Sequence, residues 1–140
     1  MQVCIDLYKC RGHPNVVADH KSTFELEKDT RLGVRGDCVV CVGCSSSKDG
    51  GCASLKGPAA IYLVAIQLWP LKVVWVPVYG TSPGSKPSRL IVRRSSHREN
   101  SLMVDATRAS ADLPDEVRRA LTSPFTKCLA LHVVLSEQAG

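Results

Sequence analysis

The residues best suited to chemistry in this 140-residue chain lie in the segment from Arg11 to Cys44. Imidazole, carboxylate, thiol, ammonium and guanidinium groups all occur there, beside glycines that permit sharp backbone turns. Such groups bind metals, hold anions or activate nucleophiles. The concentration predicts a functional site near the N-terminus. Because no spacing within it matches a known reaction motif, several chemistries stay open.

Metal binding is the first of these chemistries. His13 and His20 are seven residues apart, so on one continuous strand they would point to opposite faces. A loop that begins at Pro14 would let them converge. With Asp37 or Cys38 they would form a three-ligand set suited to zinc or iron. A divalent metal held by His13, His20 and Asp37 is therefore one hypothesis.

Nucleophilic catalysis is a second hypothesis. Cys38 could act as the nucleophile, with His13 or His20 as its base and Arg35 as the cation that lowers its pKa. The catalytic candidates are then His13, His20, Asp37 and Cys38. Cys38 also begins the strand-like run Cys38–Val42, where a thiol that only packs in the core is the simpler interpretation.

Binding of a small anion or a nucleotide is the third. The candidate ligand-binding residues are Arg11, His13, His20, Lys21, Arg35 and Asp37. A further basic run contains Lys86, Arg89, Arg93 and Arg94 and could position nucleic-acid phosphates. No aromatic residue interleaves it, so a base-stacking surface is not indicated. A solvated edge strand protected by its charges explains the same pattern.

Composition narrows the classes of protein. The chain has 44% hydrophobic residues, 22% charged residues and a formal net charge of +5, which are ordinary values for a globular protein. Gln67, Pro70, Lys72 and Pro77 interrupt its longest apolar stretch, which therefore favours two strands over a membrane helix. No secretory signal is visible, and we expect a cytoplasmic protein without a membrane segment. The chain shows no phosphate-binding glycine loop, dinucleotide-binding fingerprint or common hydrolase motif.

The cysteines are numerous for such a protein. Their odd number, seven, argues against a secreted disulfide framework and favours buried thiols, although intracellular disulfides do occur in hyperthermophiles. The run Cys38–Cys44 resembles a metal-ligand run, but its valines favour a strand and Ser47 occupies the place of the expected fourth cysteine.

The pattern of apolar residues predicts a β-rich α+β fold. Strands are expected near 2–10, 22–28, 37–44, 60–68, 72–79, 88–94, 101–106 and 128–136. One clear helix is expected near 113–121, with Asp112 as its N-cap. Trp69 and Trp75 are expected to anchor the core.

The elements occur twice in the same order. Segment 22–28 aligns with 88–94, 40–44 with 102–106, and 61–66 with 128–133. This predicts one domain over residues 1–140, made of two pseudo-repeated halves at about 1–70 and 72–140. The halves would share one sheet or close a barrel-like core, which would also remove exposed strand edges.

The chain resembles a small archaeal family known as domain of unknown function 371. The matching motifs are Gly12–Asn15, His20–Glu25, Arg35–Val40 and the stretch from Leu102 to Leu113. The resemblance implies a compact archaeal protein but no established activity. Relatives tend to repeat a Gly-His-Pro motif in the second half, where this chain has Gly80-Thr81-Ser82-Pro83, so a mechanism with two symmetric sites is not expected.

The sequence thus leaves two classes of function. The favoured class is a binding module for a small anion, a nucleotide or nucleic acid. The alternative is a small metal-dependent or Cys/His-based hydrolase-like enzyme centred on the catalytic candidates above. A homodimer is expected only if the halves leave an exposed sheet edge.

Overall fold

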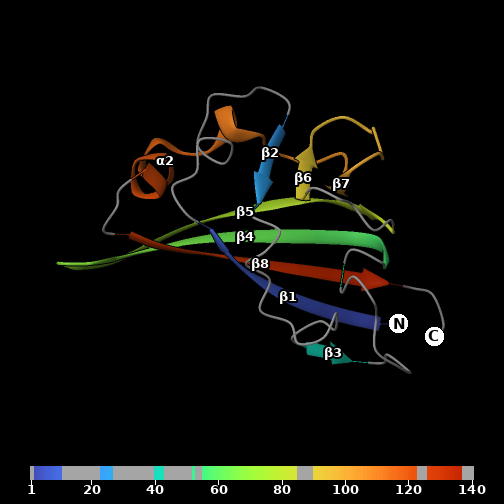
Figure 1. Cartoon of the computed structure of the whole chain (residues 1–140), viewed down its shortest axis with the longest axis horizontal. Coiled ribbons are helices and arrows are strands. Elements are labelled where there is room, and N and C mark those ends of the chain that lie inside the picture. The colour runs from blue at the N-terminus through green and yellow to red at the C-terminus, as the bar shows by residue number, and fades with distance from the viewer. Residues whose placement is uncertain are drawn as a thin grey trace.

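The computed structural model describes residues 2–10, 23–26, 40–42, 52, 55–84, 90–122 and 126–136 (Figure 1). Strands dominate this part of the chain, as the sequence predicts, and every predicted strand has an observed counterpart. The elements in chain order are β1 (Gln2–Cys10), β2 (Thr23–Leu26), β3 (Val40–Val42), β4 (Lys56–Leu68), β5 (Leu71–Pro83), β6 (Leu90–Arg93), β7 (Ser101–Met103), the 3-10 helix η3 (Ser110–Asp112), α2 (Asp115–Thr122) and β8 (Thr126–Ser136).

The larger sheet has five strands in the order β3-β1-β8-β4-β5, and all of its neighbours are antiparallel. Its longest pairing is the β4–β5 hairpin, which keeps one register from Lys56↔Pro83 to Leu68↔Leu71. Trp69 and Pro70 form the two-residue turn, and the peptide bond between them is cis. The end of this hairpin extends past α2 and β8 (Figure 1).

A smaller sheet has three strands in the order β2-β6-β7. It joins the larger sheet where Thr81 of β5 bridges Val104, just after β7. Gly80 permits this approach, because a Cβ there would lie 2.6 Å from Cγ of Met103 and 2.7 Å from the carbonyl oxygen of Val104.

The core lies on the inner face of the larger sheet. Alternation along the strands buries every second residue, so Ile61 and Leu63 of β4 and Val76 and Val78 of β5 point the same way. Most of the other buried hydrophobic residues pack against this row in a single cluster, and they come from β1, the rest of β4 and the segment before it, β8, the smaller sheet, α2 and the stretch before α2. The two sheets therefore share one core.

The prediction that Trp69 and Trp75 anchor this core is wrong. Trp69 is 90% exposed in the hairpin turn, and Trp75 is 60% exposed on the outer face of β5. Trp75 lies opposite Val64 in the β4–β5 register, and its neighbours Val74 and Val76 take the inward positions. Because side chains alternate between the two faces of a strand, Trp75 must point outward when Val74 and Val76 point inward.

The predicted helix near 113–121 is confirmed as α2, but its predicted N-cap is wrong. The carboxylate of Asp112 accepts a hydrogen bond of 2.8 Å from the backbone N–H of Ala109. It also pairs with Arg94 at 3.3 Å. Asp112 therefore closes the turn at η3, and α2 begins three residues later at Asp115.

The predicted barrel-like core is not found. Strands from both halves do share the larger sheet, and two pairs of segments that the duplication aligns lie side by side, because β2 pairs with β6 and β4 with β8. The described strands nevertheless form open sheets that do not close into a barrel. The first strands of the two predicted halves also differ in length, because β1 has nine residues and β5 has 13. The internal duplication and the single-domain assignment stay predictions. Of the helices in the described residues, none combines the length and apolar character that spanning a bilayer requires.

A buried thiol and carboxylate cluster as the candidate site

The first-half residues that the sequence singles out lie outside the described part of the chain. This holds for the proposed ligands, base and nucleophile, namely Arg11, His13, His20, Lys21, Arg35, Asp37 and Cys38. It also holds for Lys86 and Arg89 of the basic run. Their roles in anion binding, metal binding and catalysis therefore stay predictions.

Arg93 and Arg94 are the described members of the basic run, and both are engaged within the protein. The Arg93 guanidinium donates hydrogen bonds to Oγ of Ser101, at 2.8 Å, and to the carbonyl oxygen of Glu99, at 3.2 Å. The Arg94 guanidinium pairs with Asp112. A phosphate would have to compete with these contacts. The contacts therefore favour a structural role for the two arginines.

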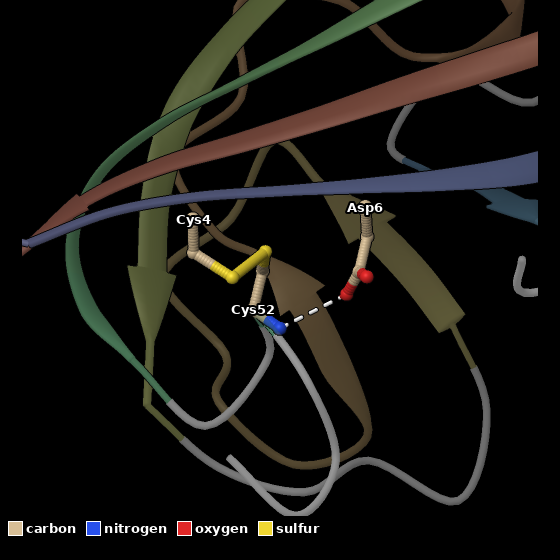
Figure 2. Close-up of side chains that lie close together, drawn as sticks. All are labelled: Cys4, Asp6 and Cys52. Atoms are coloured by element: carbon tan, nitrogen blue, oxygen red, sulfur yellow. Dashed lines mark hydrogen bonds between the residues drawn. A yellow bond between two sulfur atoms is a disulfide. The ribbon is translucent and has the colours of Figure 1, made fainter. Parts of the chain in front are cut away.

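A different group of reactive side chains comes together on β1. Figure 2 shows Cys4 and Asp6 pointing from this strand toward Cys52, which precedes β4. Their two sulfur atoms and one carboxylate oxygen all lie within 4.8 Å of one another, and all three residues are buried. Thiolates and carboxylates bind soft and borderline divalent metals, so the cysteines could serve as ligands only in their reduced form.

The alternation of β1 explains half of this arrangement. Cys4, Asp6 and Tyr8 share the inner face, whereas Val3, Ile5 and Leu7 point outward. The other half is tertiary, because Cys52 is 48 residues away from Cys4 in the chain. The backbone N–H of Cys52 donates a hydrogen bond of 3.0 Å to Oδ2 of Asp6, which fixes the carboxylate beside the sulfurs (Figure 2).

The sulfurs of Cys4 and Cys52 are bonded to each other, with their Cα atoms 5.5 Å apart. The prediction that the cysteines are buried thiols is therefore wrong for this pair, although the prediction of burial is right, since both residues are 0% exposed. Neither the odd number of cysteines nor the N-terminal sequence reveals the pairing. It follows from β1 and the segment before β4 meeting in the fold.

His132 and Tyr8 extend the polar part of the inner face. His132 is the direct partner of Asp6 in the β1–β8 register, and both are 0% exposed. The ring of His132 lies 6.4 Å from that of Tyr8, between centroids. His132 therefore lies in the core. A carboxylate and an imidazole so deeply buried side by side are uncommon, because burial of ionisable groups is costly.

Sequence reasoning missed this cluster because its signal is weak. Cys4, Asp6 and Tyr8 recur at every second position of β1 and alternate with Val3, Ile5 and Leu7, so the sequence indicates a polar face. An alternating strand normally turns its polar residues to water, which predicts the opposite orientation.

Comparison with known proteins agrees with the resemblance seen in the sequence. The chain is 25% identical over 125 residues to a protein of Methanocaldococcus jannaschii described as "Uncharacterized protein MJ0206", covering 82% of this chain and 89% of the relative. It also matches the family model "Domain of unknown function (DUF371)" over residues 8–134. Since that match spans most of the chain, the protein belongs to the DUF371 family.

Proposed function

We propose that the reduced protein binds a zinc-type divalent cation through Cys4, Asp6 and Cys52, and that the Cys4–Cys52 disulfide is its oxidised, metal-free state. The observation that carries this proposal is the convergence of two sulfurs and one carboxylate oxygen within 4.8 Å. Zinc bound by two thiolates at about 2.3 Å holds them about 3.8 Å apart in tetrahedral geometry. The disulfide holds the two sulfurs at bonding distance, so reduction must let them move apart to reach that spacing.

The surroundings of the cluster favour a tightly held ion. Cys4, Asp6 and Cys52 have no exposed surface, so water competes poorly for the metal. The hydrogen bond from the Cys52 N–H to Asp6 orients the carboxylate in the way that outer-shell contacts orient metal ligands. Three protein ligands leave the fourth position of a tetrahedral zinc site open to another ligand.

The disulfide state and the metal-bound state differ by two electrons and by the bound ion. Reduction adds two electrons and two protons to the disulfide and gives two thiols. Binding of Zn²⁺ then releases both thiol protons, so the metal affinity should rise with pH. A two-electron oxidant, such as an external disulfide that is reduced to two thiols, would re-form the Cys4–Cys52 bond, remove both thiolate ligands and expel the ion.

The test is a zinc titration of the phosphine-reduced protein in the absence of oxygen, against a competing chromophoric chelator. We expect near-stoichiometric binding, and thiolate-to-metal charge-transfer absorption when Co²⁺ replaces zinc. Cys4→Ser and Cys52→Ser should each weaken binding beyond the roughly 10- to 100-fold typical of outer-shell changes. Asp6→Asn should weaken it without abolishing the charge-transfer absorption.

Cys128→Ser is the matched control, because Cys128 lies at the far end of β8 from the residues that pair with Cys4 and Asp6. It should bind zinc like the unaltered chain. Absence of zinc from the reduced protein, or an equal loss in Cys128→Ser, would contradict the proposal and leave the disulfide with a structural role alone.

The hypotheses drawn from the first-half residues are independent of this one. A binding module for a small anion or nucleotide, and a hydrolase-like enzyme centred on His13, His20, Asp37 and Cys38, stay predictions because none of those residues is described. The zinc proposal shares with the enzyme hypothesis only its class of cofactor, and it uses different ligands.

A further inference from the structure

The outer edge of β5 has two parts, and the part near its C-terminal end is covered. Thr81 exchanges two backbone hydrogen bonds of 2.9 Å with Val104. Tyr79 donates its N–H to Oγ1 of Thr107, at 3.0 Å, and accepts the N–H of Thr107, at 2.8 Å. The segment that follows β7 therefore satisfies the edge at these two positions.

The other part of the edge begins at the hairpin turn. Because β4 and β5 keep one register throughout, residues of the same parity as Tyr79 and Thr81 direct their backbone groups away from β4. Val73 and Trp75 therefore offer N–H and C=O groups outward. Pro77 has no N–H to offer, and it ends this run. Among the described residues, no strand pairs with the edge from Leu71 to Trp75.

The side chains along this open edge are apolar and exposed. Leu71 is 74% exposed, Val73 53% and Trp75 60%, and Trp69 lies beside them at the tip. Tyr62 of β4 packs against Trp75, with ring centroids 6.2 Å apart. The row therefore continues onto the outer face of the hairpin.

Natural proteins usually guard such an edge with charge. The charged residue of this stretch is Lys72, and its side chain lies on the inner side, 2.7 Å from the carboxylate of Glu116 on α2. It does not protect the edge. A long, apolar, unguarded edge strand is a template for pairing with another chain.

We propose that the β5 edge from Leu71 to Trp75 pairs antiparallel with the same edge of a second copy of the chain, about a twofold axis at Val73. Two identical edges related by a twofold axis are complementary by construction, since each outward N–H meets an outward C=O. Leu71 then lies opposite the partner's Trp75, an aliphatic–aromatic pair of the kind that stabilises sheets.

The available surface suits a dimer. Trp69 and Trp75 are 90% and 60% exposed. With about 150–250 Å² for each fully buried aromatic side chain, they would contribute on the order of 200–400 Å² per protomer. A standard interface uses about 800 Å² per partner, and the leucines, Val73 and the backbone would supply the rest. Pro77 and the covered positions beyond it end the pairing. The twofold arrangement uses the β5 edge of both protomers, so no β5 edge is left to add a third copy and the assembly closes as a dimer.

The test is sedimentation of the full chain over a wide concentration range. We expect a species of twice the monomer mass whose dissociation constant rises at least about tenfold in Val73→Pro, which removes an outward donor that β4 does not use. Trp75→Lys places a charge on the edge and should weaken the dimer as much. Circular dichroism would verify that each variant is folded.

Leu135→Lys is the matched control, because Leu135 is an exposed hydrophobic residue, at 39%, on β8 and away from the β5 edge. It should leave the dissociation constant unchanged. Amide hydrogen exchange adds a readout specific to the pairing, since the N–H groups of Val73 and Trp75 should become protected only as the dimer forms.

Three results would overturn the proposal. The first is a monomer at every concentration, including one that instead binds lipid vesicles or another protein's strand through this edge. The second is a dimer that neither Val73→Pro nor Trp75→Lys weakens. The third is a dimer in which the amides of Val73 and Trp75 exchange as fast as in the monomer.

Discussion

The two faces of the larger sheet come from the same strands, and each carries some residues of a kind that its surroundings do not favour. The inner face contains buried polar and reactive groups, among them Asp6 and His132 at 0% exposure, beside the Cys4–Cys52 disulfide. The outer face of the hairpin contains Val73 and Trp75, both more than half exposed. In most antiparallel sheets the apolar face is buried and the polar face is solvated.

The described sheet departs from this rule in two places, the polar cluster within its apolar inner face and the apolar row on its exposed outer face. Burial of a carboxylate and exposure of a tryptophan are both unfavourable for an isolated chain. We propose a metal ion, bound after reduction of the disulfide, as the reason for the first feature and a second copy of the chain as the reason for the second. The expected outcomes below separate the contributions of the two faces.

The largest effect is expected from the disulfide on the inner face. Its reduction should lower the free energy of unfolding by about 4 kcal/mol, the chain-entropy value for a cross-link over a sequence separation of 48. Urea unfolding with and without a phosphine reductant measures this. A Cys4→Ser/Cys52→Ser double variant should not respond to the reductant, and zinc should restore part of the loss in the reduced parent chain. Identical midpoints for the oxidised and reduced parent chain would show that the cross-link has no energetic role.

A matched pair of leucines compares the faces directly. Leu63→Ala on the inner face should cost about 2–5 kcal/mol of unfolding free energy, because Leu63 is 0% exposed and its truncation leaves a cavity. Leu71→Ala, at a residue 74% exposed, should change it by no more than about 0.5 kcal/mol in dilute solution, where the chain is monomeric. Comparable losses at the two positions would mean that Leu71 is covered within the single chain.

The smallest effect is expected from the ion pair between β5 and α2. The hydrogen bond and charge of the Lys72 ammonium lower the pKa of Glu116 below its ordinary value. A lowered folded-state pKa stabilises the fold at pH values above the ordinary glutamate pKa, and this stabilisation is lost as the pH falls through the folded-state value. Since both side chains are 56% exposed, the effect on stability should be slight.

Lys72→Met should therefore return the Glu116 pKa toward its ordinary value and leave the unfolding midpoint at neutral pH nearly unchanged. An NMR titration of the Glu116 carboxylate measures the shift. Arg118→Met is the control, because Arg118 is not among the causes of the lowered Glu116 pKa. An unchanged Glu116 pKa in Lys72→Met would show that the ion pair does not persist in solution.

The sequence predicts much of the secondary structure because local patterns determine it. Alternating Val, Ile and Leu identify β4, β5 and β8, and acidic residues before basic ones identify α2. The predicted N-cap at Asp112 is wrong because that carboxylate instead accepts a hydrogen bond from the Ala109 N–H and closes the turn at η3. Patterns of this kind do not reveal which face of a strand is covered.

The candidate site is beyond prediction for the same reason. Local sequence places Cys4, Asp6 and Tyr8 on one face of β1, but it does not tell whether that face meets solvent or the core. The orientation of Trp75 is ambiguous in the same way, since valines alternate with it. Burial of one face and exposure of the other depend on how β1, β8 and the hairpin stack against the smaller sheet and α2.

The amino-acid sequence by itself determined the strand content, the helix near its C-terminal end and the family, since each of these depends on residues close together in the chain or on their order. Only the tertiary structure decided that Cys52 meets Cys4, that Asp6 lies opposite His132 on the neighbouring strand, and that no described strand pairs with the β5 edge from Leu71 to Trp75. These contacts join segments far apart in the chain. Their free energies depend on which surfaces the whole fold removes from water, and no local pattern contains that information.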